Sequence, residues 1–176
     1  MAKIHYIIGD ATNPIVRENE NSLIVHCCNT IGAWGAGFVV PLGKRYPQAK
    51  ESYKAYINKN GRGYLGEVDE VKVADHIYVE NLMGQSFLYK KPNGEIPCNY
   101  TAIRVGFKNI IEKWLAKTEN YSIHMPRIGC GLAGGDWKTI ENIIQETFIE
   151  FADVDVFVYD LKDDRITKYS KIKDYV

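Results

Sequence analysis

The sequence has no excess of charge of either sign. Its 22 Lys and Arg residues balance 22 Asp and Glu residues, so the formal net charge at pH 7 is zero. A protein without a broad electrostatic field has no general attraction for duplex nucleic acid or for anionic lipid. The balance therefore excludes nonspecific polyanion binding as the main activity and leaves room for a local basic patch.

A long, purely apolar run is also missing. Residues 21–43 carry no charge, and roughly 20 apolar residues are enough to cross a bilayer. This stretch, however, contains polar residues, a proline and several glycines, and each glycine in a helix interior costs about 1 kcal/mol. The first ten residues reach Asp10 without the apolar core of a secretory signal. We therefore expect a chain that does not enter a membrane and is located in the cytoplasm.

The four cysteines and four histidines show no spacing typical of a metal site or a disulfide framework. Cys27 and Cys28 are adjacent, and no Cys-x-x-Cys pair or zinc-finger spacing occurs. The burial tendency of cysteine favours a packing role for these thiols. Neither Gly-Lys-Ser nor Gly-Lys-Thr occurs, so the usual phosphate-binding motif of ATP hydrolysis is absent. We expect no metal and no cofactor.

The apolar pattern alternates between strand-like and helix-like segments along the chain. Strands are predicted over residues 4–8, 22–28, 68–73, 76–82, 121–128 and 154–158, and helices over 38–46, 49–61, 103–114 and 137–151. This alternation is typical of a layered α/β unit. We predict one domain spanning residues 1–176, with a core at about residues 3–161 and a charged tail at residues 162–176.

Two glycine-rich segments, residues 26–38 and 126–137, occupy equivalent positions between a predicted strand and a predicted helix. Glycine lets backbone amides approach a ligand closely, and a helix start offers unpaired N–H groups at the positive end of its dipole. Parallel strands would bring both segments to one edge of the sheet. The pair therefore predicts a phosphate or diphosphate site, although tight turns alone would explain the glycines of either segment taken singly.

The second segment also fits the dinucleotide fingerprint Gly-x-Gly-x-x-Gly. Gly129, Gly131 and Gly134 have this spacing, and Asp153 and Asp155 follow about 20 residues later. That fingerprint usually opens its domain, whereas only one predicted helix, one strand and the tail follow here. A Rossmann-type oxidoreductase is therefore the weakest of the alternatives.

Taken together, these motifs resemble those of the macrodomain family. The matching residues are Gly9-Asp10-Ala11-Thr12, residues 25–29, the loop from Gly32 to Gly37, and residues 125–137. The resemblance covers about residues 3–161 and is strongest with the stand-alone ADP-ribose-1″-phosphate phosphatases and the related terminal ADP-ribose glycohydrolases. It implies a three-layer α/β/α fold with a central mixed, mostly parallel sheet of about six strands, and an ADP-ribose cleft at the strand ends.

The resemblance also implies how ADP-ribose is held. Asp10 would accept a hydrogen bond from the adenine amino group, Asn29 would hold the distal ribose, and Tyr159 would pack on the adenine. A turn or cap role for Asp10 and a core role for Tyr159 are the alternatives. The implied ligand-binding residues are Gly9, Asp10, Ala11, Asn29, Gly35, Ala36, Gly37, Phe38, Ile128, Gly129, Cys130, Gly131, Leu132 and Tyr159.

The catalytic candidates are Asp136, His26 and Asn29. Asp136 or His26 would orient a water molecule onto the terminal phosphate among the loop amides, whereas a helix cap and a core histidine are the alternatives for these two residues. Two devices of related enzymes are absent. Val39 lies near the place where members that cleave carboxylate esters often carry an aspartate, and Ala133 stands where the terminal glycohydrolases carry a lysine.

We therefore expect a monomer that binds ADP-ribose and hydrolyses the phosphate from ADP-ribose-1″-phosphate. A hydrolase that removes ADP-ribose from modified protein or nucleic acid would use the same pocket and is one alternative. A non-catalytic ADP-ribose reader is the other.

Overall fold

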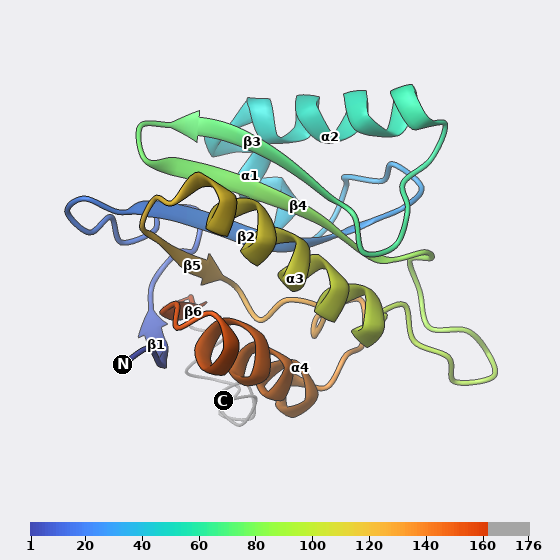
Figure 1. Ribbon diagram of the computed structural model, residues 1–176. Coiled ribbons are helices and arrows are strands. Elements are labelled where there is room, and N and C mark those ends of the chain that lie inside the picture. The colour runs from blue at the N-terminus through green and yellow to red at the C-terminus, as the bar shows by residue number, and fades with distance from the viewer. Residues whose placement is uncertain (162–176) are drawn as a thin grey trace.

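The computed structural model describes residues 1–161, which form a six-stranded sheet between two layers of helices (Figure 1). The strand order is β1-β6-β5-β2-β4-β3, and among these strands every pairing is parallel except β3 with β4. The strands are β1 (Ile4–Ile8), β2 (Asn21–Asn29), β3 (Val68–Ala74), β4 (Ile77–Gln85), β5 (Tyr121–Met125) and β6 (Val156–Asp160). The predicted mixed, mostly parallel sheet is confirmed, and the charged tail predicted for residues 162–176 lies outside the described residues.

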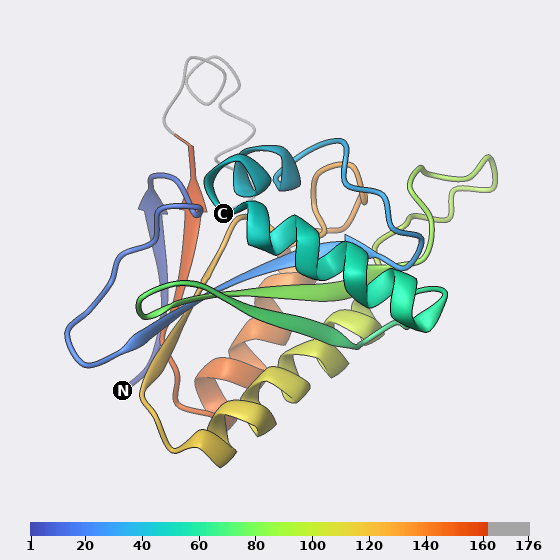
Figure 2. The same ribbon diagram turned by 90° about the horizontal axis from the view of Figure 1, so that it is seen from above.

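Helices cover both faces of the sheet (Figures 1 and 2). One layer contains α1 (Val39–Arg45) and α2 (Pro47–Asn60). The other contains α3 (Tyr100–Lys117) and α4 (Trp137–Ile144), which continues into the π-helical segment η1 (Gln145–Phe151). The helix predicted over residues 137–151 is thus present, with its second half wound more widely. Within residues 1–161, no helix combines the length and the apolar character needed to cross a bilayer.

The core has two halves because each central strand is buried on both of its faces. On β2, Leu23 and Val25 pack with Phe107 and the rest of the α3 and α4 side, whereas Ile24 packs with Tyr53 on the α1 and α2 side. All of these side chains are fully buried. A strand covered on both faces reads as a continuous apolar run, which explains why this strand was recognisable from sequence.

Several predicted boundaries differ from those in the structure: β4 ends at Gln85 instead of residue 82, and α3 spans Tyr100–Lys117 instead of residues 103–114. Two other strands show the physical reason for their shift. The strand predicted over residues 121–128 ends at Met125, because proline at position 126 has no N–H to continue the ladder and its carbonyl accepts from the Ile128 N–H in a turn (2.8 Å). The last strand is β6 at residues 156–160 instead of 154–158. Val154 precedes it, and its N–H donates to the carbonyl of Phe148 in η1 (2.8 Å).

On the α1 and α2 side, the β1–β2 connection, residues 9–20, covers β5 and β6. Ala11 packs against Phe157 and Tyr159 of β6. The Arg17 guanidinium lies 5.2 Å from the centre of the Phe157 ring. A segment without regular structure therefore forms part of the layer over this end of the sheet.

Gly106 provides a test of the packing between α3 and β4. A Cβ added at this helix-interior glycine would lie 2.4 Å from Cγ of Leu82, which is fully buried. Alanine favours the helix by about 1 kcal/mol, but overpacking a core costs about 1–3 kcal/mol. We expect Gly106→Ala to lower the free energy of unfolding in urea by about 1–2 kcal/mol.

Leu115→Ala is the control on the same helix, because Leu115 is 72% exposed. Its effect should stay within about 0.5 kcal/mol. An alanine at position 106 that leaves stability unchanged would contradict the close approach of α3 to β4.

Candidate functional site

The carboxyl ends of five parallel strands, β1, β6, β5, β2 and β4, lie along one edge of the sheet. Gly9 and Asp10 follow β1, the first glycine loop (residues 30–38) follows β2, and the second glycine loop (residues 126–136) follows β5. Because β5 and β2 are neighbours, the prediction that both glycine segments meet at one edge is confirmed. Neighbouring strands lie about 4.8 Å apart, so three strand spacings place the ends of β1 and β2 about 14 Å apart.

Asn29 organises the first glycine loop. Its side-chain oxygen accepts hydrogen bonds from the N–H groups of Ile31 (3.1 Å) and Ala33 (3.0 Å), and its amide nitrogen donates to the Ala33 carbonyl (2.9 Å). Tyr53 from α2 donates to the Asn29 carbonyl (2.6 Å). Asn29 is consequently buried beneath the loop, and residues 35–37 form its exposed part.

His26 lies below the same loop. Its ring is 1% exposed and contacts the rings of Trp34 and Phe38, with centroids 5.6 Å and 5.8 Å away. Burial lowers the pKa of His26 to about 4, so the imidazole is neutral at pH 7. Asn81 uses its amide nitrogen to donate to Asp69 (3.1 Å), which leaves its oxygen to accept from His26 Nε2 (2.5 Å). The structure thus places His26 where it supports the loop from inside.

The second glycine loop is a tight turn with an exposed tip. Gly129 has a φ of +71°, a conformation that favours glycine, and a Cβ there would lie 2.9 Å from Cys98 Sγ. The Gly135 N–H donates to the Gly129 carbonyl (2.7 Å) and closes the turn. Gly131 and Leu132 stand at the tip, where Leu132 is 62% exposed. The backbone of the tip is therefore available to a ligand.

Two charged residues fix the ends of the second glycine loop. Arg127 donates from Nε and Nη2 to the two carboxylate oxygens of Asp160 at the end of β6, both at 2.8 Å. Asp136 caps α4, because its Oδ2 accepts from the N–H (3.0 Å) and the hydroxyl (2.9 Å) of Thr139. Both capping contacts use Oδ2, and within residues 1–161 Oδ1 makes no hydrogen bond. Asp136 is exposed, so Oδ1 is available to a ligand or a water molecule.

Asp10 is held in a turn directly after β1. One of its oxygens, Oδ1, accepts from the N–H and the hydroxyl of Thr12, both at 2.8 Å. Thr12 is in turn fixed by the α1 end, because the Tyr46 hydroxyl donates to its carbonyl (2.8 Å) and Arg45 Nε donates to its hydroxyl (3.1 Å). Phe38 packs against the cluster that contains Ala11, so the first glycine loop and the β1 end are in contact.

The predicted site residues thus occupy three levels. Exposed at the edge are Gly35, Ala36, Gly37, Gly131, Leu132 and Asp136. Half-buried behind them are Gly9, Asp10, Phe38 and Cys130. Buried beneath are Ala11, His26, Asn29, Ile128, Gly129 and Tyr159. The roles given to these residues stay predictions, and the buried ones are separated from a ligand at the edge by the layer above them.

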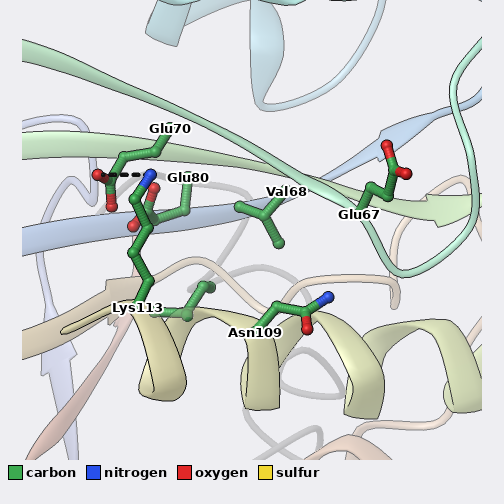
Figure 3. Close-up of a pocket in the computed structure, with 7 residues that line it drawn as sticks. Glu67, Val68, Glu70, Glu80, Asn109 and Lys113 are labelled. Carbon is green, nitrogen blue, oxygen red and sulfur yellow. Dashed lines mark ion pairs between the residues drawn. The ribbon is translucent and has the colours of Figure 1, made fainter. Parts of the chain in front are cut away.

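Sequence reasoning missed two facing glutamates, one fully buried and one half-buried, on the face of the sheet that α3 covers (Figure 3). Glu70 and Glu80 stand directly opposite each other in the β3–β4 register, and Glu80 is fully buried. They line a cavity of about 260 Å³ whose mouth carries Asn109 and Lys113. The signal in the sequence is Glu80, a charged residue within the strand predicted over residues 76–82.

The pKa values of the two glutamates are shifted in opposite directions. Burial, together with the neighbouring Glu70 carboxylate, raises the pKa of Glu80 well above its usual value. Burial opposes ionisation of Glu70, but hydrogen bonds from Glu80, Trp114 and Lys113 outweigh it and lower the pKa of Glu70 to about 2. Glu80 Oε2 has no hydrogen-bond partner among the described residues, so a negative charge on this carboxyl would be poorly compensated. We assign this cavity to the architecture of the sheet and not to the glycine-loop site.

The raised pKa of Glu80 predicts a pH dependence of stability. Because the pKa of Glu80 is higher in the folded than in the unfolded chain, the folded state holds the extra proton, and the free energy of unfolding falls as pH rises from 4.5 towards the folded pKa. Glu80→Gln keeps a donor to Glu70 and cannot ionise. We expect the variant to gain stability relative to the wild type as pH rises from about 5 to about 9 in urea titrations.

Glu112→Gln is the matched control, since Glu112 is an exposed residue of α3. Its stability should follow the wild-type pH profile. Parallel profiles for the wild type and Glu80→Gln would contradict a raised pKa of Glu80 in the folded chain.

A three-layer α/β/α fold with glycine loops after adjacent parallel strands defines a class of proteins that bind phosphate groups at strand ends. No protein-family model matches the sequence. A macrodomain protein of Streptomyces coelicolor has a similar structure, with a TM-score of 0.74 and 34% identity, covering 90% of this chain and 99% of that one. The chain therefore belongs to the macrodomain family, as the motifs predicted.

Two further relatives are informative. A Bacteroides thetaiotaomicron protein described as of unknown function is 42% identical, with a TM-score of 0.84, covering 91% of this chain and 99% of that one. The ADP-ribose 1″-phosphate phosphatase of Candida albicans is 27% identical over 163 residues, covering 81% of this chain and 92% of its own length.

Proposed function

We propose that the chain binds ADP-ribose along the sheet edge and hydrolyses the phosphate ester of ADP-ribose-1″-phosphate. The observation that carries the proposal is the meeting of both glycine loops and Asp10 at the carboxyl ends of parallel strands. The Candida albicans phosphatase supports the choice of substrate, because the similarity spans 92% of its length.

The order of the strands assigns a direction to the ligand. Asp10, beyond β1, lies at one end of the row, where its free carboxylate oxygen accepts from the adenine amino group. The second glycine loop, beyond β5, and the first glycine loop, beyond β2, lie next to each other. Their backbone N–H groups donate to the diphosphate, and α1 and α4 begin directly after the loops, so their positive ends favour the same anion.

Asp136 is the residue best placed to act on the phosphate. In the proposed reaction a water oxygen attacks phosphorus and the bond from phosphorus to the ribose oxygen breaks, which yields phosphate and ADP-ribose. Oδ1 of Asp136 accepts the proton of the water, while the Thr139 contacts hold Oδ2 and fix the carboxylate. Loop amides stabilise the charge on the phosphoryl oxygens, and the departing ribose oxygen takes a proton from solvent.

His26 and Asn29 contribute indirectly in this proposal. His26 is neutral and covered by Trp34 and Phe38. The side chain of Asn29 is occupied by hydrogen bonds to the backbone of the first glycine loop. Both residues hold that loop in the shape that presents its amides. We propose as well that the chain acts as a monomer in the cytoplasm and needs no cofactor.

The decisive variant is Asp136→Asn. Asparagine caps helices as well as aspartate does, so α4 is preserved, while the proton acceptor is lost. We expect kcat for phosphate release from ADP-ribose-1″-phosphate to fall by about 100-fold or more, with the Kd for ADP-ribose from calorimetry changed by less than about twofold. Asp75→Asn, in the exposed β3–β4 turn, is the control. Full activity in the Asp136 variant would remove this residue from the mechanism.

The same assay separates the alternatives when an ADP-ribosylated peptide and an ADP-ribosylated oligonucleotide are included. Release of ADP-ribose from either one, with ADP-ribose-1″-phosphate left intact, would establish a de-ADP-ribosylating hydrolase. Tight binding without turnover of any substrate would establish a reader.

Asp10 tests the adenine end of the proposal. Asp10→Asn keeps an oxygen for the Thr12 contacts but loses the charge that strengthens the bond to the adenine amino group. We expect the affinity for ADP-ribose, measured by calorimetry, to fall by about 1–2 kcal/mol. Asp75→Asn again serves as the control, and an unchanged Kd would show that the ligand does not reach Asp10.

A further inference from the structure

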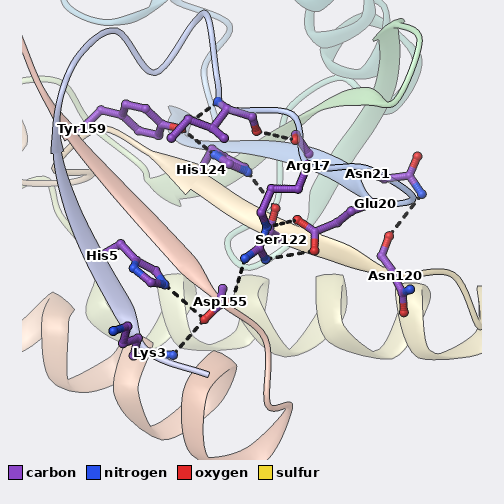
Figure 4. Close-up of polar contacts among 12 residues, drawn as sticks. Lys3, His5, Arg17, Glu20, Asn21, Asn120, Ser122, His124, Asp155 and Tyr159 are labelled. Carbon is purple, nitrogen blue, oxygen red and sulfur yellow. Dashed lines mark hydrogen bonds and ion pairs between the residues drawn. The ribbon is translucent and has the colours of Figure 1, made fainter. Parts of the chain in front are cut away.

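A row of buried polar side chains crosses β5 and β6 beneath the β1–β2 connection (Figure 4). Ser122 and His124 lie on the same face of β5, and Tyr159 lies on β6. The Ser122 hydroxyl is 2.8 Å from His124 Nε2, and the Tyr159 hydroxyl is 2.7 Å from His124 Nδ1. None of the three side chains is more than 5% exposed. Polar groups this deeply buried are stable only when they are paired.

The row ends on the backbone of the β1–β2 connection. The Ile15 N–H donates to the Tyr159 hydroxyl (3.0 Å), so that hydroxyl directs its own hydrogen to His124 Nδ1, and the ring N–H at Nε2 donates to Ser122. Burial, with a smaller contribution from the charge of Arg17, lowers the pKa of His124 to about 3. The ring is therefore neutral and able to accept at Nδ1.

Ile15 is held on both of its backbone polar groups. Its N–H is bound by Tyr159, and its carbonyl accepts from the Ser22 hydroxyl of β2 (2.9 Å). An irregular segment cannot satisfy its own backbone groups as a helix does. Side chains of β2 and β6 therefore fix the β1–β2 connection at Ile15, five residues after Asp10.

We propose that Tyr159 is a positioning residue that holds residues 11–16 through Ile15 and thereby sets the adenine-side carboxylate of Asp10. This inference rests on the proposed function. It assigns Tyr159 a different role from packing on adenine, because the ring is 5% exposed and its hydroxyl is engaged. The Tyr159 tether, the hydrogen bond from the Ile15 N–H to the Tyr159 hydroxyl, affects binding of the nucleotide and leaves the chemistry at Asp136 unchanged.

Tyr53 is the counterpart of Tyr159 on the diphosphate side of the proposed site. Its hydroxyl donates to the Asn29 carbonyl (2.6 Å) and accepts from the Gly32 N–H (3.1 Å), so it ties down the first glycine loop. One buried tyrosine therefore serves each end of the site, and the two hydroxyls can be removed separately.

The test is Tyr159→Phe, which keeps the ring and removes the tether. We expect the KM for ADP-ribose-1″-phosphate and the Kd values for ADP-ribose and AMP to rise by about five- to tenfold, with kcat within about twofold. Inhibition by inorganic pyrophosphate should be unchanged. Amide hydrogen exchange over residues 11–16 should be faster.

Two further variants give the comparison. Ser122→Ala should shift the same quantities in the same direction by less. Tyr53→Phe should give the opposite pattern, with weaker inhibition by pyrophosphate.

Tyr121→Phe is the control for the loss of a tyrosine hydroxyl in this part of the sheet. Tyr121 is the first residue of β5, the neighbour of β6, and its ring packs against Trp114. Unchanged affinity and unchanged exchange in Tyr159→Phe would overturn the inference and would show that only the ring matters. Equal losses of AMP and pyrophosphate binding would also overturn it, since they would indicate general loosening.

Failure of the proposed function has a different signature. A wild type that binds ADP-ribose but releases no phosphate refutes the phosphatase activity, and the Kd and exchange measurements still decide the role of Tyr159. A wild type that does not bind ADP-ribose overturns both.

Discussion

The parallel pairing of β1, β6, β5 and β2 is the constraint on which the site depends. The carboxyl ends of parallel strands lie at the same edge of a sheet. Segments more than 100 residues apart in sequence, such as those after β1 and β5, are therefore brought together by the strand pairing itself. The antiparallel strand β3 lies at the far end of the order and takes no part in the row. Sheet topology, more than any single motif, therefore explains why two glycine loops form one site.

Neutral polar side chains also lie one layer below the loop backbone that we propose faces the ligand. Asn29 and Tyr53 shape the first glycine loop, and His26 contacts its aromatic residues from below. Tyr159 and His124 do the same for the β1–β2 connection. Ligand-binding loops that present free N–H groups have few backbone partners of their own, so their shape must come from elsewhere. Burying neutral groups achieves this without the larger desolvation cost of buried charges.

The features predicted well from sequence are those that local pattern determines. Apolar runs gave the strands, and glycine-rich segments gave the loops, because both follow from nearby residues. The polar pairs escaped prediction. The contacts between His124 and Tyr159, and between Glu70 and Glu80, depend on which strands are neighbours and in what register, and periodicity specifies neither. A buried His26 was one of the two readings open from the sequence, whereas the burial of Asn29 escaped, since its cover comes from the loop that follows it and from α2.

The layers on the two faces of the sheet divide the work of the proposed reaction. Asp136 is fixed by α4, in the layer that also contains α3, whereas Asp10, the first glycine loop and their tethers belong to the layer of α1 and the β1–β2 connection. Recognition of the adenine end at Asp10 and activation of the water at Asp136 therefore rest on contacts that share no side chain. Substitutions that loosen one layer are expected to leave the other intact, because effects at sites without common partners are close to additive. This separation would let substrate preference change by substitution in the connection while the chemical step is retained.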